Sequence, residues 1–108
     1  MKQHLDINIY GKVQGVFFRA QAMEKAMKLN ITGYADRLQG GNIQIEAEGE
    51  EKDLRNFLQW CQRGPYLAKV EMIIVEYSSE IKNFSFFEIR KSQIEENSLR
   101  RVRFMATR

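Results

Sequence analysis

The residues whose types and spacing suggest chemistry lie in one short segment, Gly15-Val16-Phe17-Phe18-Arg19. A glycine lets the backbone curl so that successive N–H groups point to one side and form a concavity that binds anions. The Arg19 guanidinium offers a planar fork of donors that matches phosphate oxygens. Three or four hydrogen bonds to a charged group, each worth roughly 1.5–3 kcal/mol, would hold a phosphate without a metal. These residues alone leave two interpretations open: a phosphate-binding loop, and an ordinary turn with a solvated arginine.

The flanking sequence predicts that this segment joins a strand to a helix. Leu5-Asp6-Ile7-Asn8-Ile9 alternates apolar and polar residues, which is typical of a half-buried strand. Residues 19–30 are rich in Ala, Met, Lys and Glu, with apolar residues at helical spacing. A loop that enters a helix exposes unpaired N–H groups beside the positive end of the helix dipole, and this arrangement favours an anion. We expect at least one of Phe17 and Phe18 in the core, and either one is a candidate apolar wall beside a ligand.

The remaining elements predict an α+β fold. Strands are expected over residues 34–38 and 42–48, joined by a Gln39-Gly40-Gly41 hairpin, and a helix over residues 50–63. An apolar strand is expected over residues 68–77, and residues 84–89 are a candidate for one more. The order β-α-β-β-α-β is that of the ferredoxin-like split β-α-β sandwich, with an antiparallel sheet and two helices on one face. Many unrelated activities use this fold, so the fold does not identify the function.

Composition argues against several classes of site. The 108 residues suffice for one domain, and no apolar run is long enough for a membrane span or a signal peptide. The only cysteine, Cys61, cannot form an internal disulfide, so a reducing, cytoplasmic location is expected. The only histidine, His4, is expected to be solvated, which leaves little support for histidine catalysis or a histidine-rich metal site. Glu46 and Glu48 alternate with apolar residues, and we expect them on the outward face of their strand rather than around a metal.

The net charge of +3 belongs to the C-terminal segment. Residues 1–90 carry 12 basic and 12 acidic side chains, whereas residues 91–108 carry five and two. We therefore predict a domain over residues 1–90 and a basic C-terminal extension over residues 91–108. The extension could bind nucleic acid or an acidic partner, or add a strand, but a solvated tail is the commonest outcome. Nucleic acid ranks low, because Phe84-Ser85-Phe86-Phe87 lacks the glycine pattern of RNA-binding domains with this fold.

Val13-Gln14-Gly15-Val16-Phe17-Phe18-Arg19 resembles the signature of the acylphosphatase family. The resemblance continues with matching gaps through Gly33-Tyr34, Gly41, Gly49 and Gly64-Pro65, and it covers nearly all of the predicted domain. Acylphosphatases hydrolyse the carboxyl–phosphate bond of small acyl phosphates without a metal or a cofactor, so the resemblance implies this activity. It implies a small acyl phosphate or inorganic phosphate as ligand, with no membrane partner. It also implies that Arg19 neutralises the phosphoryl charge and that six backbone amides cradle the group, those of Gln14, Gly15, Val16, Phe17, Phe18 and Arg19.

Arg37 departs from the pattern of the family that the chain resembles. The family orients the attacking water with an asparagine four residues after the glycine that matches Gly33, and this position is Arg37. An arginine has donors only, so it can bind phosphate but cannot accept a hydrogen bond from water. If Leu38-Gln39-Gly40-Gly41 forms a four-residue loop, Asn42 lies opposite Arg37 as a speculative replacement, although a turn-edge role is the plainer interpretation. Two functions follow: an acyl phosphate hydrolase whose activity is reduced or lost through Arg37, and a non-catalytic domain that binds phosphate or acyl phosphate.

Overall fold

The computed structural model describes residues 1–90, and the predicted basic extension lies outside the described residues. The predicted order of strands and helices is confirmed. The division of the chain at residue 90 stays a prediction. The elements are β1 (Lys2–Lys12), α1 (Phe18–Lys28), β2 (Thr32–Arg37), β3 (Ile43–Glu50), α2 (Glu51–Arg63), β4 (Lys69–Ser78) and β5 (Phe87–Ile89).

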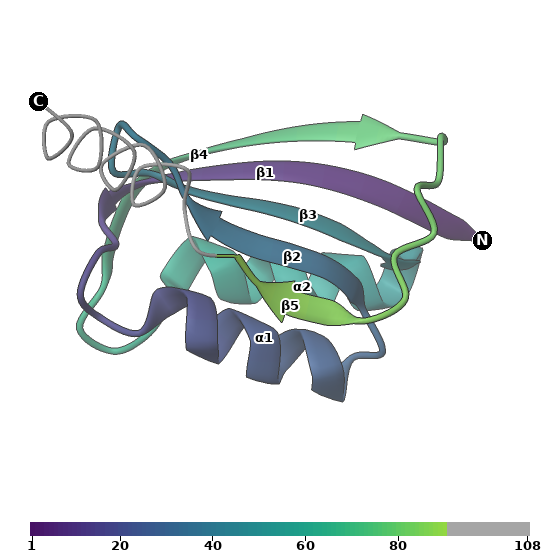
Figure 1. Ribbon diagram of the computed structural model, residues 1–108, viewed down its shortest axis with the longest axis horizontal. Coiled ribbons are helices and arrows are strands. Elements are labelled where there is room, and N and C mark those ends of the chain that lie inside the picture. The colour runs from purple at the N-terminus through teal and green to yellow at the C-terminus, as the bar shows by residue number, and fades with distance from the viewer. Residues whose placement is uncertain (91–108) are drawn as a thin grey trace, which may run out of the picture.

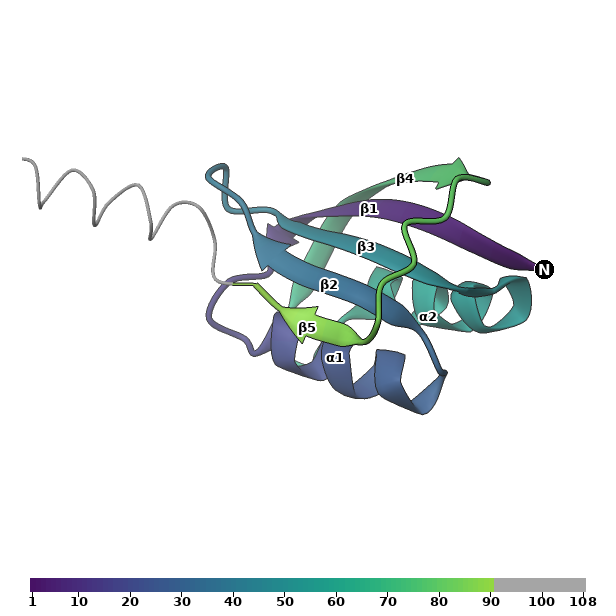
Figure 2. The same ribbon diagram turned by 45° about the vertical axis from the view of Figure 1, so that its right-hand side comes forward.

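The five strands form one sheet in the order β4-β1-β3-β2-β5, and both helices lie on one of its faces (Figure 1). Neighbours among the first four strands are antiparallel, as predicted, but β5 pairs with β2 in parallel, so the sheet is mixed. The direction of β5 follows from the connection before it. Residues 79–86 run from the end of β4 to the end of the sheet at which β2 begins (Figure 2), so the chain returns in the direction of β2.

The core lies between the sheet and the helices, and it holds both ends of the β1–α1 loop. α1 buries Phe18, Ala22 and Ala26, which are spaced four residues apart and therefore share one face. Val13, at the end of β1, is only 1% exposed, and Phe18, at the start of α1, is 2% exposed. Each buried apolar side chain of this size stabilises the fold by roughly 1.5–3 kcal/mol. Residues 14–17 are therefore a short loop stretched between two fixed anchors.

Cys61 lies on the inner face of α2 and is fully buried. Its burial raises the pKa of the thiol far above the usual range, because the charged thiolate loses its hydration. The thiol therefore behaves as a small apolar group, in agreement with a structural role rather than a reactive one.

The sheet face away from the helices carries a buried group of polar side chains, which includes the histidine that the sequence interpretation placed in solvent. His4 is only 5% exposed, so the prediction that it is solvated is wrong, and Glu46 and Glu48 are also buried, at 7% and 0% exposed. The His4 Nδ1 atom lies 2.7 Å from Glu48 Oε2, and its Nε2 atom lies 3.0 Å from Glu46 Oε1. Strand alternation predicted the correct face for these residues. It could not show that another part of the chain covers them.

The cover over this face is the connection between β4 and β5. The Glu48 carboxylate accepts hydrogen bonds from the backbone N–H groups of Lys82 at 2.5 Å, Asn83 at 2.9 Å and Phe84 at 3.3 Å. The Lys82 ammonium pairs with Glu46 at 2.8 Å. We call His4, Glu46, Glu48 and Lys82 the carboxylate cluster. It ties residues 82–84 to β3 and so fixes the path that leads into β5.

Candidate functional site

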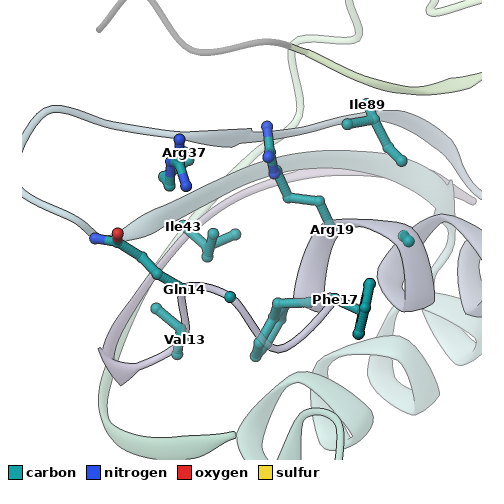
Figure 3. Close-up of a pocket in the computed structure, with 10 residues that line it drawn as sticks. Val13, Gln14, Phe17, Arg19, Arg37, Ile43 and Ile89 are labelled. Carbon is teal, nitrogen blue, oxygen red and sulfur yellow. The ribbon is translucent and has the colours of Figure 1, made fainter. Parts of the chain in front are cut away.

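A pocket of about 350 Å³ lies between the β1–α1 loop, the start of α1 and the ends of β2, β3 and β5 (Figure 3). Its volume is near the lower end of the roughly 300–1,000 Å³ range of small-molecule sites. The lining includes every predicted phosphate-binding residue except Val16, whose side chain packs against the core. The residues that line the pocket are Val13, Gln14, Gly15, Phe17, Phe18, Arg19, Ala20, Arg37, Ile43 and Ile89.

The backbone of the β1–α1 loop has the shape of an anion-binding nest. Gly15 has a φ of 67° and Phe17 a φ of 60°, so two residues with left-handed backbone angles are separated only by Val16, whose φ is negative. A Cβ atom at Gly15 would meet no atom within 4 Å, so the backbone angle, and not the space, favours glycine. An aromatic residue in this conformation costs roughly 1–3 kcal/mol. The buried anchors Val13 and Phe18 hold this strained conformation in place.

The backbone N–H groups of the loop can donate to a bound anion, because no other group within residues 1–90 accepts a hydrogen bond from them. Among residues 1–90, the backbone hydrogen bonds stop at Val13, which donates to Gly11 O at 3.0 Å, and resume at Gln21, which donates to Phe17 O at 3.0 Å. Phe17 caps α1 without a side-chain hydrogen bond, and the first turn of α1 contains no acidic residue. The positive end of the helix dipole therefore has no carboxylate of its own, and it favours a bound anion.

Arg19 lies in the first turn of α1, with its guanidinium at the pocket. Its Nη1 donates to the backbone carbonyl of Arg90 at 2.8 Å. The Arg90 N–H donates to Ala35 O at 2.9 Å, and its guanidinium lies 3.7 Å from the centroid of the Tyr34 ring. The carbonyl that orients Arg19 is thus held by the pairing of β5 with β2. A guanidinium has five N–H donors, so one anchored donor leaves others for a ligand.

Arg37 and Asn42 do not form the cross-strand pair that was predicted from the hairpin sequence. Arg37 lines the pocket, as expected for the position at which the family places its asparagine. It pairs with Ile43 and not with Asn42, because the loop has five residues and is closed by Leu38 N donating to Asn42 O at 2.9 Å. A shift of one residue moves a side chain to the other face of a strand. On the opposite face of the sheet from Arg37, Asn42 Nδ2 donates to Asn8 Oδ1 at 2.9 Å. The predicted pairing was therefore wrong, and Asn42 does not line the pocket.

The two phenylalanines of the loop separate as expected. Phe18 is buried in the core, whereas Phe17 is 75% exposed at the pocket. Ile43 and Ile89 add apolar surface that the sequence interpretation missed. The strand pattern could have indicated Ile43, since it is the first residue after the hairpin. No local signal could have indicated Ile89, because it reaches the pocket only through the pairing of β5 with β2.

The electrostatic character of the pocket comes from Arg19 and Arg37. Its lining, as drawn from residues 1–90, contains no Asp, Glu or His. Within the same range no cluster of three or more His, Cys, Asp or Glu side chains is arranged to hold a metal ion. In the described part of the chain no helix is long and apolar enough to cross a membrane. The pocket as built can attract and orient an anion, with arginine and backbone N–H groups as donors.

Comparison with known proteins agrees with this geometry. The sequence profile of the acylphosphatase family matches residues 5–89. The acylphosphatase of Thermus thermophilus is 40% identical over 81 residues, which cover 73% of this chain and 92% of that protein. The acylphosphatase of Geobacter metallireducens is 36% identical over 90 residues, covering 83% and 97% of the two chains. The crystal structure of the acylphosphatase from Bacillus subtilis superposes with a TM-score of 0.79 at 32% identity, covering 83% of this chain and 99% of that one.

Proposed function

The chain belongs to the acylphosphatase family, and we propose that it hydrolyses small acyl phosphates in the pocket between the β1–α1 loop and Arg19. The observation that carries the proposal is the loop itself. Two of its residues, Gly15 and Phe17, have left-handed backbone angles, and the first turn of α1 that follows contains no acidic residue. The loop, the start of α1 and Arg19 all line one pocket. This combination binds an anion with donors of fixed direction, which is what phosphoryl transfer requires.

In this proposal the phosphoryl oxygens accept hydrogen bonds from the loop amides, and Arg19 neutralises part of their charge. The acyl group lies against the apolar surface of Phe17, Ile43 and Ile89. Water attacks phosphorus and the bond from phosphorus to the carboxyl oxygen breaks, which yields a carboxylate and inorganic phosphate. The water protons remain with phosphate and solvent. A carboxylate has a pKa near 4, so it leaves without being protonated, and a pocket of arginines and amides suffices without a general acid.

Arg37 is the part of the pocket that we expect to limit turnover. Its guanidinium only donates hydrogen bonds, so it cannot accept one from the attacking water as an amide oxygen can. We expect Arg37→Asn to raise kcat on benzoyl phosphate by about 10-fold, because a correctly placed water reacts faster than an unheld one. Arg37→Lys is the matched control, since lysine also lacks an acceptor, and its kcat should not rise. An unchanged kcat for Arg37→Asn would show that position 37 does not limit the reaction.

The experiment that tests the function separates turnover from binding. The full chain is assayed on benzoyl phosphate and acetyl phosphate, and binding of inorganic phosphate is measured by calorimetry on the same preparation. Hydrolysis above the uncatalysed rate, with inorganic phosphate acting as a competitive inhibitor, would support the proposal. Binding of phosphate without hydrolysis would reject it and support the non-catalytic binding domain.

A further inference from the structure

We propose that Arg90 and Tyr34 are positioning residues for Arg19: the stack of the Arg90 guanidinium on the Tyr34 ring fixes the backbone carbonyl that orients Arg19. This inference rests on the proposed function, since it assigns residues that act on the same pocket. Within the described chain, neither Arg90 nor Tyr34 is among the residues that line the pocket. An effect of this pair on a ligand therefore passes through another residue.

Arg90 is held by its N–H, its side chain and its carbonyl. The N–H donates to Ala35 O at 2.9 Å, and the guanidinium lies 3.7 Å from the centroid of the Tyr34 ring. The carbonyl accepts a hydrogen bond from Arg19 Nη1 at 2.8 Å. The side chain and the carbonyl branch from the same Cα atom, so a contact that fixes the side chain also restricts the direction of the carbonyl.

The strand before Arg90 is short, so its end benefits from a side-chain anchor. β5 has three residues, Phe87–Ile89, and lies at the edge of the sheet, where it pairs with β2. Phe87 anchors the start of β5, since it is 6% exposed and its ring lies 6.1 Å from that of Phe57. Arg90 lies beyond the other end, and the ends of short elements open readily. The stack on Tyr34 provides the anchor there.

The Tyr34 ring is a fixed support because it is bonded to the carboxylate cluster. Tyr34 is 6% exposed, and its hydroxyl donates to Glu46 Oε2. Burial and then this hydrogen bond raise the pKa of Tyr34 far above its usual value, so the hydroxyl keeps its proton and remains a donor. Glu46 pairs in turn with Lys82 at 2.8 Å and with His4 at 3.0 Å. A guanidinium attracted to the face of this ring is therefore held against a rigid part of the fold.

The orientation of Arg19 matters because its side chain is long. Each of its rotamers would place the charge at a different distance from the phosphoryl oxygens. The bond from Nη1 to the Arg90 carbonyl favours one orientation and leaves other N–H donors for the ligand. A donor oriented before the ligand arrives needs no reorganisation during the reaction.

The test is a double-mutant cycle on the full chain, read by titration with inorganic phosphate. The amide NMR signals of the β1–α1 loop follow the titration, since they measure weak binding as well as tight binding and need no turnover. We expect Arg90→Ala to weaken phosphate binding by about 5-fold, because the carbonyl remains but its side-chain anchor is lost. In the Arg19→Ala background the same substitution should change the affinity by less than about 1.5-fold, since the carbonyl then has no guanidinium to orient. An equal loss in both backgrounds would indicate a purely structural role and overturn the inference, as would no loss in either.

Conservative variants test the stack itself. Arg90→Lys keeps a cation for the ring and Tyr34→Phe keeps the ring for the cation, so both should bind phosphate within about 2-fold of the wild type. Tyr34→Leu removes the ring and should lose as much affinity as Arg90→Ala. Arg55→Ala removes an exposed arginine of α2 outside the pocket and should leave the affinity unchanged. Equal losses for Tyr34→Phe and Tyr34→Leu would contradict the stack.

Kinetics on benzoyl phosphate separates this inference from the proposed function. We expect Arg90→Ala to lower kcat by about 10-fold with a smaller change in KM, because an oriented guanidinium matters most in the transition state. A change in KM alone would contradict a role through Arg19. If the wild type hydrolyses no acyl phosphate but the phosphate cycle gives the expected result, the proposed hydrolysis fails and the positioning role stands. If the wild type is active and the cycle gives equal losses, the positioning role fails and the function stands.

Discussion

The pocket and the carboxylate cluster both place charged side chains against the same sheet, but the opposite charge comes from different sources. In the cluster, Glu48 is fully buried. Its carboxylate is hydrogen-bonded to His4 and accepts hydrogen bonds from the three backbone N–H groups of residues 82–84. In the pocket, Arg19 lies among lining residues that, within residues 1–90, include no carboxylate. A charge enclosed by protein must be satisfied by protein, because water cannot reach it. A charge at an open pocket can be left for a ligand.

The two helix starts show the same difference. The first turn of α2 contains Glu51 and Asp53, which complement its dipole, whereas the first turn of α1 contains no acidic residue. The helix that serves the fold alone is thus neutralised by its own side chains. The helix that enters the pocket keeps its positive end for an anion.

Arg19→Ala should remove the main cation that the pocket offers to a phosphoryl group, and we expect it to have the largest effect. Removing the guanidinium takes away both a charge and a directed donor from the transferring phosphoryl group, so we expect kcat on benzoyl phosphate to fall by about 10³-fold or more. Steady-state kinetics measures this loss. Arg55→Ala is the control for the loss of one surface charge and should change kcat by less than about 2-fold. A variant Arg19→Ala that retains most of its activity would remove Arg19 from the proposed chemistry.

Glu48→Ala should remove the central acceptor of the carboxylate cluster, and we expect it to lower the stability of the fold. The substitution leaves His4 and the N–H groups of residues 82–84 without their acceptor in a buried site, so we expect the free energy of unfolding to fall by about 3 kcal/mol. Urea denaturation measures this change. Glu50→Ala, on the same strand but exposed, should cost less than about 1 kcal/mol. Equal costs for the two variants would contradict the importance of the buried contacts.

Ala20→Glu should make the start of α1 resemble the start of α2. Ala20 lines the pocket in the first turn of α1, so a carboxylate there would compete with a ligand for the helix dipole and the loop amides. We expect the affinity for inorganic phosphate to fall by about 10-fold, while the free energy of unfolding rises by about 0.5 kcal/mol. Calorimetry and urea denaturation measure the two quantities. Ala20→Gln has nearly the same shape without the charge, and a similar loss of affinity for it would attribute the effect to crowding.

Acidification should weaken the cluster, and this is the smallest of the four effects. Burial by itself would raise the pKa of Glu48, but hydrogen bonds from the Lys82 backbone, His4 and the Phe84 backbone outweigh it and lower the pKa below 4.5. The pKa of Glu46 is also lowered, because bonds from Lys82 and Tyr34 outweigh its burial. A carboxyl whose pKa is lower in the folded state contributes stability above pH 4.5, and that contribution is lost as the pH falls through the folded-state pKa.

Urea midpoints between pH 7 and pH 3 measure this dependence. The wild type should lose stability as the pH falls below about 4.5, and Glu48→Gln should show a shallower fall, because it lacks one of the titrating groups. A variant with the same pH dependence as the wild type would show that Glu48 does not contribute to it. The sign is as informative as the size, since a gain of stability on acidification would contradict the lowered pKa values.

Features that depend on neighbouring residues were predictable from the sequence. Apolar alternation in β1 and helical spacing in α1 are local, so both elements were predictable. Gly15 and Arg19 are only four residues apart in the sequence, so their convergence on a helix start was predictable as well. The face of the sheet on which Glu46 and Glu48 lie also followed from the two-residue period of a strand.

The segment that covers each face, and the residues that lie opposite one another, depend on long-range contacts that local sequence patterns do not reveal. Asn42 missed the pocket because the hairpin loop has five residues instead of four, and one residue of register reverses a side chain. His4 and Glu48 are buried because residues 82–84, more than 30 positions after Glu48, hydrogen-bond over them. Ile89 and the Arg90 carbonyl reach the pocket through the pairing of β5 with β2. Periodicity specifies the direction in which a side chain points, whereas long-range pairing specifies what it meets there.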